Sequence, residues 1–360
     1  MTHRVHNFCA GPCTLPLPVL REVADELVEF DHTGMSLVEM SHRSPIYDEV
    51  HHNTMSLLRE LMHVPDDVSV LLLQGGATLQ FAMVPMNTLT PGATAAYIDS
   101  GTWGSKALAD ASRWGDAYPA WSGSDEGYVR MPEETDLEIR PGSRYLHLTS
   151  NETIGGIRMP DFPDPGVPLI GDMSSDFLTR PVPWERFDLI YGGAQKNLGP
   201  AGLAVVFVRD RLIESAPDDL PSYLAYATHA KADSLANTPP MFPIWVMGKV
   251  LTWMREQGGV EAMATQTAAK ASAIYDVIDS GDFYRSPVDP RYRSHTNVVF
   301  RLPSPELESE FLAEAERAGM ANLKGHRSVG GVRASLYVGL PMEWATDLAT
   351  FMSDFRASRG

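Results

Sequence analysis

Short apolar runs that alternate with helical segments constrain the fold of this 360-residue chain most strongly. Five such runs have the length of buried strands: Val68–Leu73, Ala95–Ile98, Tyr145–Thr149, Pro168–Ile170 and Leu189–Tyr191. Segments with helical patterning follow the first two runs, at Thr78–Asn87 and Lys106–Trp114. Because strands that are apolar on both faces need helices on both sides, the pattern predicts an α/β fold with a mainly parallel sheet.

The pattern changes after Gly281, which suggests a second domain. Two long helical stretches, Phe242–Gln257 and Val260–Ile278, come before the change. Beyond it, shorter segments read as strand, helix, strand and helix: Asn297–Leu302, Pro305–Ala318, Val332–Tyr337 and Met342–Phe355. The length of the chain also favours two domains. We therefore expect a large domain over 16–258 and a smaller α+β domain over 259–360.

Composition limits the partners and the location of the protein. The net charge of −17 argues against nucleic acid or an anionic membrane as a main partner, although a local cluster of arginines could still bind an anionic small molecule. The sequence has no apolar stretch of about 20 residues and no signal-peptide core, so we expect a cytoplasmic protein. Cys9 and Cys13 lack the further ligands of a zinc site, which predicts free thiols and no metal.

One lysine stands at the end of an apolar run. Lys196 follows Leu189–Tyr191 and two glycines, and a second apolar run begins at Ala204. The other five lysines have charged, polar or helical surroundings that suit a solvated amine: Lys106, Lys231, Lys249, Lys270 and Lys324. Desolvation lowers the pKa of a lysine and makes its amine nucleophilic, as covalent attachment to an aldehyde requires. The alternative is a lysine that merely caps a turn.

The ends of the other apolar runs carry further candidate groups. In open parallel sheets, ligands bind at the carboxyl ends of the strands. Gly75-Gly76 opens a helix and could hold a phosphate on its N–H groups, and Trp103 could stack on a flat ring. Thr153 adds a hydroxyl, and Asp172 adds a carboxylate 24 residues before Lys196. Each feature alone has a structural explanation, but together they are the set that pyridoxal 5'-phosphate requires.

With these residues in place, the chain resembles the phosphoserine aminotransferases, a family of fold-type I pyridoxal-phosphate enzymes. Seven stretches carry the resemblance, in order along nearly the full chain: Met40–Arg43, Gln74–Phe81, Ser150–Ile154, Asp172–Asp176, Gly193–Pro200, Asn237–Pro240 and Gly325–Ser335. The resemblance implies a large domain with a mainly parallel seven-stranded sheet, a small α+β domain, and a segment over 1–15 that associates with the small domain and the active site.

The resemblance also implies the residues that hold the cofactor. It assigns Lys196 to the covalent bond and the proton transfer, and Asp172 to the pyridine nitrogen. It assigns Trp103 to stacking on the ring and Thr153 to the phenolic oxygen. The phosphate would be bound by three residues: Ala77, Thr78 and Gln195. Asn237 and Thr238 would reach the phosphate from a second subunit, so the family implies a homodimer with shared active sites.

The implied reaction moves an amino group from glutamate to 3-phosphohydroxypyruvate, as in serine biosynthesis. Arg333 would bind the substrate carboxylate, and a basic group would bind the phosphate or the second carboxylate of glutamate: His42, Arg43, His326 and Arg327. A second role on 4-phosphohydroxythreonine, in pyridoxine synthesis, stays open. The chain departs from the family pattern at Ala10, at Val338 and at Thr78, where some members carry an arginine.

Two alternatives remain at this point. Another small-substrate aminotransferase of the same class, such as one acting on alanine or serine with glyoxylate, would need fewer cations than Arg43, His326 and Arg327 supply. A non-catalytic dimer with the same fold would be free to lose Lys196 and Asp172, which this chain retains. We therefore expect an active enzyme that uses a phosphorylated substrate.

Overall fold

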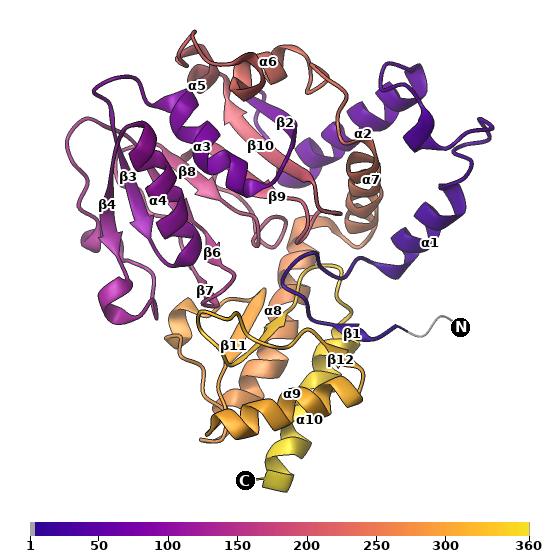
Figure 1. Ribbon diagram of the computed structural model, residues 1–360, viewed down its shortest axis with the longest axis vertical. Coiled ribbons are helices and arrows are strands. Elements are labelled where there is room, and N and C mark those ends of the chain that lie inside the picture. The colour runs from indigo at the N-terminus through magenta and orange to yellow at the C-terminus, as the bar shows by residue number, and fades with distance from the viewer. Residues whose placement is uncertain (1–3, 360) are drawn as a thin grey trace.

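A seven-stranded sheet forms the centre of the larger part of the chain in the computed structural model, which describes residues 4–359 (Figure 1). The strand order is β2-β10-β9-β8-β5-β3-β4. The strands have these bounds: β2 (Val68–Gln74), β3 (Thr94–Asp99), β4 (Asp116–Ser122), β5 (Ser143–Thr149), β8 (Leu169–Asp172), β9 (Phe187–Gly193) and β10 (Leu203–Arg209). Only β10 runs against its neighbours within this sheet, so the predicted mainly parallel, seven-stranded sheet is confirmed.

The two faces of this sheet bury separate sets of side chains. On β2, Leu71 and Leu73 pack toward α3 (Ala77–Thr88) and α4 (Thr102–Trp114), and the intervening Leu72 packs toward the opposite core. That second core includes side chains of α2 (Pro45–Met62) and α7 (Met241–Glu256). Successive strand residues point to opposite faces, so a continuous apolar run serves both cores. The remaining helices of this part are α1 (Leu17–Glu26), α5 (Asp210–Glu214) and α6 (Tyr226–Lys231).

A smaller part with its own core lies below the sheet in Figure 1. Its elements are α8 (Gly259–Asp279), β11 (Asn297–Phe300), α9 (Pro305–Arg317), β12 (Met320–Ala321), β13 (Val332–Ser335) and α10 (Met342–Arg359). The N-terminal strand β1 (His6–Asn7) pairs with β12 in parallel, and Phe8 joins the core of this part. Because the first turns of α8 pack into the core of the larger part, the domain boundary near residue 258 stays a prediction.

Several elements differ from those that the sequence predicts. Strand β4 was not predicted, and it contains Pro119 at a register shift against β3. Proline is tolerated there because β4 is an edge strand and the register is irregular. Helix α4 begins at Thr102 rather than at Lys106, which places Trp103 in its first turn. The hairpin of β6 (Asn151–Glu152) and β7 (Ile157–Arg158) was also not predicted.

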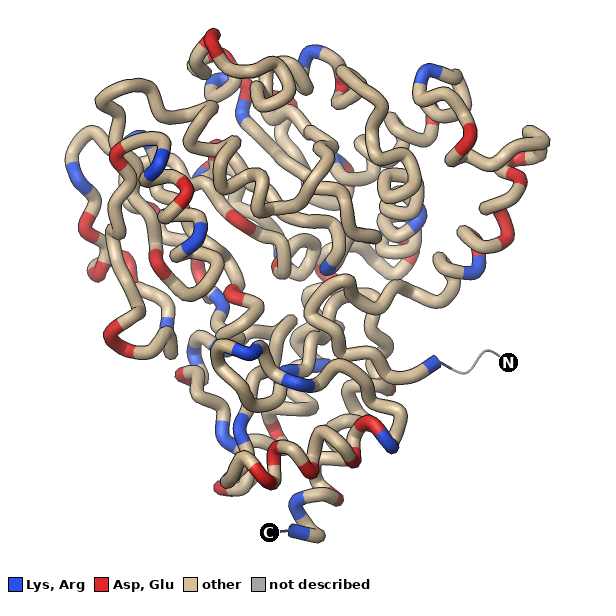
Figure 2. Tube along the Cα trace, viewed as in Figure 1, with Lys and Arg blue, Asp and Glu red and all other residues tan. Residues whose placement is uncertain are grey.

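Charged residues are interspersed over the whole chain. Figure 2 shows acidic and basic segments on both parts, with much of the central sheet free of either. No helix within residues 4–359 combines the length and the apolar composition that crossing a bilayer needs.

Candidate active site

The predicted cofactor residues gather at one edge of the central sheet. Since β2, β3, β5, β8 and β9 all run in the same direction, their carboxyl ends lie at the same edge. Asp172 is the last residue of β8, and Lys196 follows β9 by three residues. Trp103 and Thr153 follow the ends of β3 and β5, and Ala77 follows that of β2. Strand direction alone therefore brings together groups from five separate segments.

Lys196 is buried, with only 8% of its surface exposed. Its Nζ donates a 2.6 Å hydrogen bond to Oγ1 of Thr153 and lies 5.7 Å from the centre of the Trp103 ring. Burial lowers the pKa of the Lys196 amine to about 8, although the nearby carboxylates of Asp172 and Glu152 oppose that shift. A neutral amine is therefore accessible near neutral pH, and only a neutral amine can attack an aldehyde.

Asp172 is a buried carboxylate held between neighbouring strands. It pairs in register with Thr149 on β5 and with Tyr191 on β9, and its Oδ1 accepts a hydrogen bond from the N–H of Ser174 at 2.9 Å. Burial raises the pKa of Asp172, and the Lys196 amine and the bonds from Ser174 oppose the shift. A buried carboxylate of this kind gains stability from a cationic partner such as a protonated ring nitrogen.

Glu152 fixes the helix turn that carries Trp103. The carboxylate of this fully buried residue accepts hydrogen bonds from the N–H groups of Trp103, at 3.1 Å, and Gly104, at 2.8 Å. It thereby caps α4, whose N-cap residue, Gly101, has no side chain. Burial raises the pKa of Glu152 to about 7, and these backbone bonds oppose the shift. Sequence reasoning missed Glu152, although it lies within the stretch Ser150–Ile154.

The start of α3 offers a site for an anion. Its N-cap, Gly76, makes no side-chain cap, so the first N–H groups of this 12-residue helix, at Ala77 and Thr78, are available to a ligand. Gln195 is half-buried beside Lys196, and its side chain lies so close to Gly193 that a Cβ there would collide with it.

A second group of predicted residues brings positive charge to the site. Nη1 of Arg333, on β13, lies 3.4 Å from the main-chain oxygen of Thr153 and donates to it. His326 and Arg327 lie in the loop between β12 and β13. The pKa of His326 is lowered by desolvation and by the positive charges of Arg333, Arg327 and Lys106. The smaller part of the chain therefore presents cations to the sheet edge that carries Lys196.

Three of the four other predicted residues, His42, Asn237 and Thr238, are linked by polar contacts at Gln74, the last residue of β2. Thr238 Oγ1 lies 3.2 Å from Nδ1 of His42, and the main-chain oxygen of Thr238 accepts a 2.8 Å hydrogen bond from Gln74. Asn237 Nδ2 lies 3.5 Å from Oε1 of Gln74. Arg43 is exposed next to His42. No hydrogen bond within residues 4–359 joins this group to Lys196, Asp172 or Arg333.

These residues fit pyridoxal 5'-phosphate. The uncapped start of α3 suits its phosphate, the buried carboxylate of Asp172 suits its ring nitrogen, and the amine of Lys196 suits its aldehyde. Nε1 of Trp103 is buried without a hydrogen-bond partner in the described structure, and the indole packs against the core on one side while it lies near the Lys196 amine.

The prediction that only Lys196 is buried is wrong. Lys270, on α8, is just 1% exposed, and its Nζ donates hydrogen bonds to the main-chain oxygens of Tyr337 at 2.8 Å and Leu340 at 3.1 Å. Burial lowers the pKa of Lys270 to about 7. The helical spacing did contain a signal, because Lys270 lies on the same stripe as Met263, Thr267 and Ile274. Cys9 and Cys13 are free thiols, as predicted.

Known proteins match the chain over its full length. Residues 5–343 match the family described as "Aminotransferase class-V". The phosphoserine aminotransferase of Niallia circulans is 49% identical over 362 residues, covering 100% of both chains. The structure of phosphoserine aminotransferase from Bacillus circulans subsp. alkalophilus superimposes with a TM-score of 0.98, at 49% identity over 100% of both chains. That of the pyridoxal-phosphate-bound enzyme from Trichomonas vaginalis gives a TM-score of 0.92, at 34% identity over 97% of this chain and 100% of that one. The chain therefore belongs to the class-V aminotransferases, which depend on pyridoxal phosphate, and within them to the phosphoserine aminotransferase family.

Proposed function

We propose that this enzyme transfers the amino group of L-glutamate to 3-phosphohydroxypyruvate, giving O-phospho-L-serine and 2-oxoglutarate. The observation that carries the proposal is the cationic group formed by Arg327 and Arg333 on the side of the site that carries Lys196, with the imidazole of His326 among them. The chain has a net charge of −17, so a dianionic phosphate needs a local excess of positive charge in order to bind. Arginine binds phosphate and carboxylate through paired, charged hydrogen bonds.

Lys196 carries the chemistry at the reacting carbon. Bound pyridoxal phosphate supplies an electron sink for the negative charge that develops at the substrate Cα. Lys196 would hold the cofactor through its amine, and the same amine would take the proton from the substrate Cα. The burial that lowers the pKa of Lys196 to about 8 makes this amine a base near neutral pH.

The other cofactor residues hold and orient the ring. Asp172 would bind the ring nitrogen, and Thr153, which already accepts a hydrogen bond from Lys196, would bind the phenolic oxygen. Trp103 would stack on the ring, held in place by the bond between its N–H and Glu152. The phosphate would lie at the start of α3, contacted by three residues: Ala77, Thr78 and Gln195.

Different substrate residues bind the two ends of the substrate. Arg333, whose guanidinium reaches the Thr153 main chain, would bind the α-carboxylate that both substrates share. The phosphate of one substrate and the γ-carboxylate of the other would bind to the guanidinium groups of Arg43 and Arg327 and to the imidazoles of His42 and His326. Both substrates therefore present the same Cα–H bond to Lys196.

We infer that the enzyme acts as a homodimer with shared sites. His42, Asn237 and Thr238 cluster at Gln74, with no hydrogen bond to Lys196 within residues 4–359, and they would complete the site of the partner subunit. Exposed apolar side chains near this cluster in sequence support a buried contact: Leu27, Val28, Met35, Val38 and Ile46. We also propose a cytoplasmic location, which the free thiols of Cys9 and Cys13 favour.

A substrate panel tests the reaction. The purified enzyme is supplied with L-glutamate and either 3-phosphohydroxypyruvate, hydroxypyruvate or glyoxylate, and 2-oxoglutarate is measured. We expect the phosphorylated acid to give a kcat/KM at least about a hundredfold above the other two, because only it engages the whole cationic group. Equal or better turnover of glyoxylate would instead assign the enzyme to the glyoxylate aminotransferases of this class.

A further inference from the structure

The side-chain amide of Asn297 uses all of its hydrogen-bonding positions inside the protein. Asn297 begins β11 and is fully buried. Its Oδ1 accepts hydrogen bonds from Nδ2 of Asn151, at 2.9 Å, and from Oγ1 of Thr296, at 3.2 Å. Its Nδ2 donates to Oγ of Ser335, at 3.0 Å, and to the hydroxyl of Tyr337, at 3.2 Å. An amide has two donors and two acceptor positions, so this side chain is completely satisfied.

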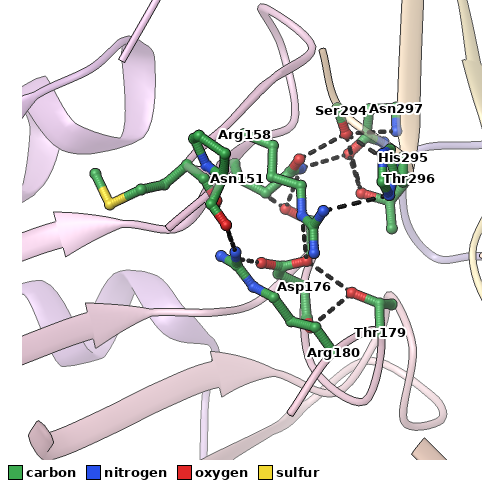
Figure 3. Close-up of polar contacts among 12 residues, drawn as sticks. Asn151, Arg158, Asp176, Thr179, Arg180, Ser294, His295, Thr296 and Asn297 are labelled. Atoms are coloured by element: carbon green, nitrogen blue, oxygen red, sulfur yellow. Dashed lines mark hydrogen bonds and ion pairs between the residues drawn. The ribbon is translucent and has the colours of Figure 1, made fainter. Parts of the chain in front are cut away.

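On one side, this amide connects to Lys196. Asn151 also donates through Nδ2 to Oγ of Ser175 at 2.9 Å. The same oxygen accepts a 3.2 Å bond from Oγ1 of Thr153, which in turn accepts the bond from Lys196. Figure 3 shows Asn151 directed toward Asn297, with one dashed contact between the two side chains. The path crosses from the smaller part of the chain to the sheet edge through buried groups only.

On the other side, the amide connects to the strand that carries Arg333. Strands β11 and β13 are antiparallel, with Asn297 opposite Ser335 and Val299 opposite Arg333. Arg333 and Ser335 are two residues apart, so their side chains leave β13 on the same face. The bond from Asn297 to Ser335 therefore fixes the face of β13 from which the Arg333 guanidinium extends.

We propose that Asn297 is a positioning residue for the substrate: it sets the distance between the Arg333 guanidinium and the Lys196 amine. The inference rests on the role proposed above for Arg333 in binding the α-carboxylate. Asn297 itself contacts neither substrate nor cofactor. It acts because the carboxylate and the Cα of one small substrate must reach Arg333 and Lys196 at the same time, so a guanidinium that is no longer held in place binds the carboxylate less tightly.

The contact between the two parts of the chain does not depend on Asn297 alone. Oγ of Ser294 donates a 2.5 Å hydrogen bond to Oδ1 of Asn151, and Nη1 of Arg158 lies 3.2 Å from Nδ1 of His295. Arg158 and Arg180 also hold the buried carboxylate of Asp176, next to the same contact (Figure 3). These links keep the hairpin β6–β7 against the segment before β11 when the Asn297 amide is removed.

The test is Asn297→Ala in the holoenzyme, followed in single-turnover half-reactions with L-glutamate and with O-phospho-L-serine. We expect the apparent Kd for both amino acids to rise about tenfold, because they share the α-carboxylate, with the limiting rate changing less than about threefold. The visible absorption of the bound cofactor should be retained. Ser335→Ala, a smaller change that cuts only the link to β13, should raise both Kd values about threefold, and it serves if Asn297→Ala does not fold.

Asn87→Ala is the matched control. Asn87 is also fully buried, with hydrogen bonds to the main chain of Met83, Leu224 and Tyr226, but it lies at the far end of α3. The Asn87→Ala variant should have a lower thermal stability but an unchanged Kd for both amino acids. If Asn297→Ala and Ser335→Ala raised the Kd values no more than Asn87→Ala does, the inference would be overturned.

A double-mutant cycle separates this inference from the proposed function. Adding Asn297→Ala to Arg333→Ala should change the Kd values less than about twofold, since Asn297 acts through Arg333. A full tenfold effect in that background would overturn the inference while leaving the role of Arg333 intact. An unchanged Kd in Arg333→Ala alone would instead overturn the proposed role of Arg333, and the inference with it.

Discussion

The amine of Lys196 donates a 2.6 Å hydrogen bond to the hydroxyl of Thr153, which lies 43 residues earlier in the chain. This contact places a buried amine with a pKa lowered to about 8 at the edge of the sheet where the other cofactor residues meet. It also ties the end of β9 to the hairpin that follows β5. The positions of Lys196 after β9 and of Thr153 after β5 therefore both depend on the order of the strands in the sheet.

Replacing Lys196 should abolish cofactor attachment. We expect Lys196→Ala to stay folded, because the buried carboxylates of Asp172 and Glu152 keep their main-chain hydrogen bonds, but to lose the visible absorption of the attached cofactor and nearly all turnover. Spectra and steady-state rates of the purified variant check this. Lys231→Ala, at an exposed lysine, is the control and should match the wild type. A Lys196→Ala enzyme that kept both properties would contradict the assignment.

Removing the Glu152 carboxylate should loosen the cofactor. Glu152→Ala leaves the N–H groups of Trp103 and Gly104 without their acceptor, and losing such a cap costs about 0.5–2 kcal/mol. We expect cofactor affinity to fall several-fold, as measured by equilibrium dialysis, with a smaller loss in Glu152→Gln. If both variants bound the cofactor as tightly as the wild type, Glu152 would have no part in orienting Trp103.

The charge state of Lys270 should make stability depend on pH. Burial lowers its pKa to about 7, whereas an unfolded lysine has a pKa near 10.4, so between these values the unfolded chain binds more protons. The free energy of unfolding should therefore rise with pH across this window because of Lys270, by at most about 1.4 kcal/mol per unit.

Lys270→Met should remove that part of the pH dependence. The stability advantage of the wild type over Lys270→Met, from urea unfolding, should grow between pH 7 and 9. Lys231→Met, at an exposed position, should run parallel to the wild type. A constant difference between the wild type and Lys270→Met across this range would show that the lysine does not titrate as its burial implies.

Arg327 and Arg43 should choose the substrate by its phosphate. Losing one charged contact should lower kcat/KM for 3-phosphohydroxypyruvate about tenfold to a hundredfold. Because Thr78 brings no charge, Arg327→Ala should cost more here than in family members that carry an arginine at that position, and it should impair the phosphate half-reaction more than the glutamate one. Both half-reactions are measured in each variant. If both variants kept the wild-type selectivity between hydroxypyruvate and its phosphorylated form, the assignment of Arg327 and Arg43 to the substrate phosphate would be wrong.

Two inactive variants should restore activity when they share a dimer. Lys196→Ala lacks the amine, and Asn237→Ala with Thr238→Ala lacks the contacts proposed to reach the partner's cofactor. A mixed dimer of the two has one site with neither defect, so refolding an equal mixture should recover about a quarter of wild-type activity, by random pairing of subunits into shared sites. A fully active monomer in sedimentation, or no recovery in a verified hybrid, would rule out shared sites.

Much of this protein could be predicted from local sequence. Apolar runs such as Val68–Leu73 specify buried strands by composition alone, and the residues that follow them must lie at the strand ends. Lys196 and Asp172 could be named as a pair for this reason, because parallel strands bring their carboxyl ends to one edge. Strand β4 was not predicted because it contains Pro119. Proline in a strand is tolerated only at a sheet edge or where the register is irregular.

The tertiary structure decided what local sequence leaves open. Whether the amine of Lys270 is solvated depends on the loop that packs over α8, about 70 residues away, and not on its neighbours in the helix. Asn151 and Asn297 are 146 residues apart, and only the contact between the two parts of the chain makes them partners. Composition and periodicity determine which segments are buried, whereas the partners of a buried polar group are set by three-dimensional packing, because its hydrogen bonds are directional and short.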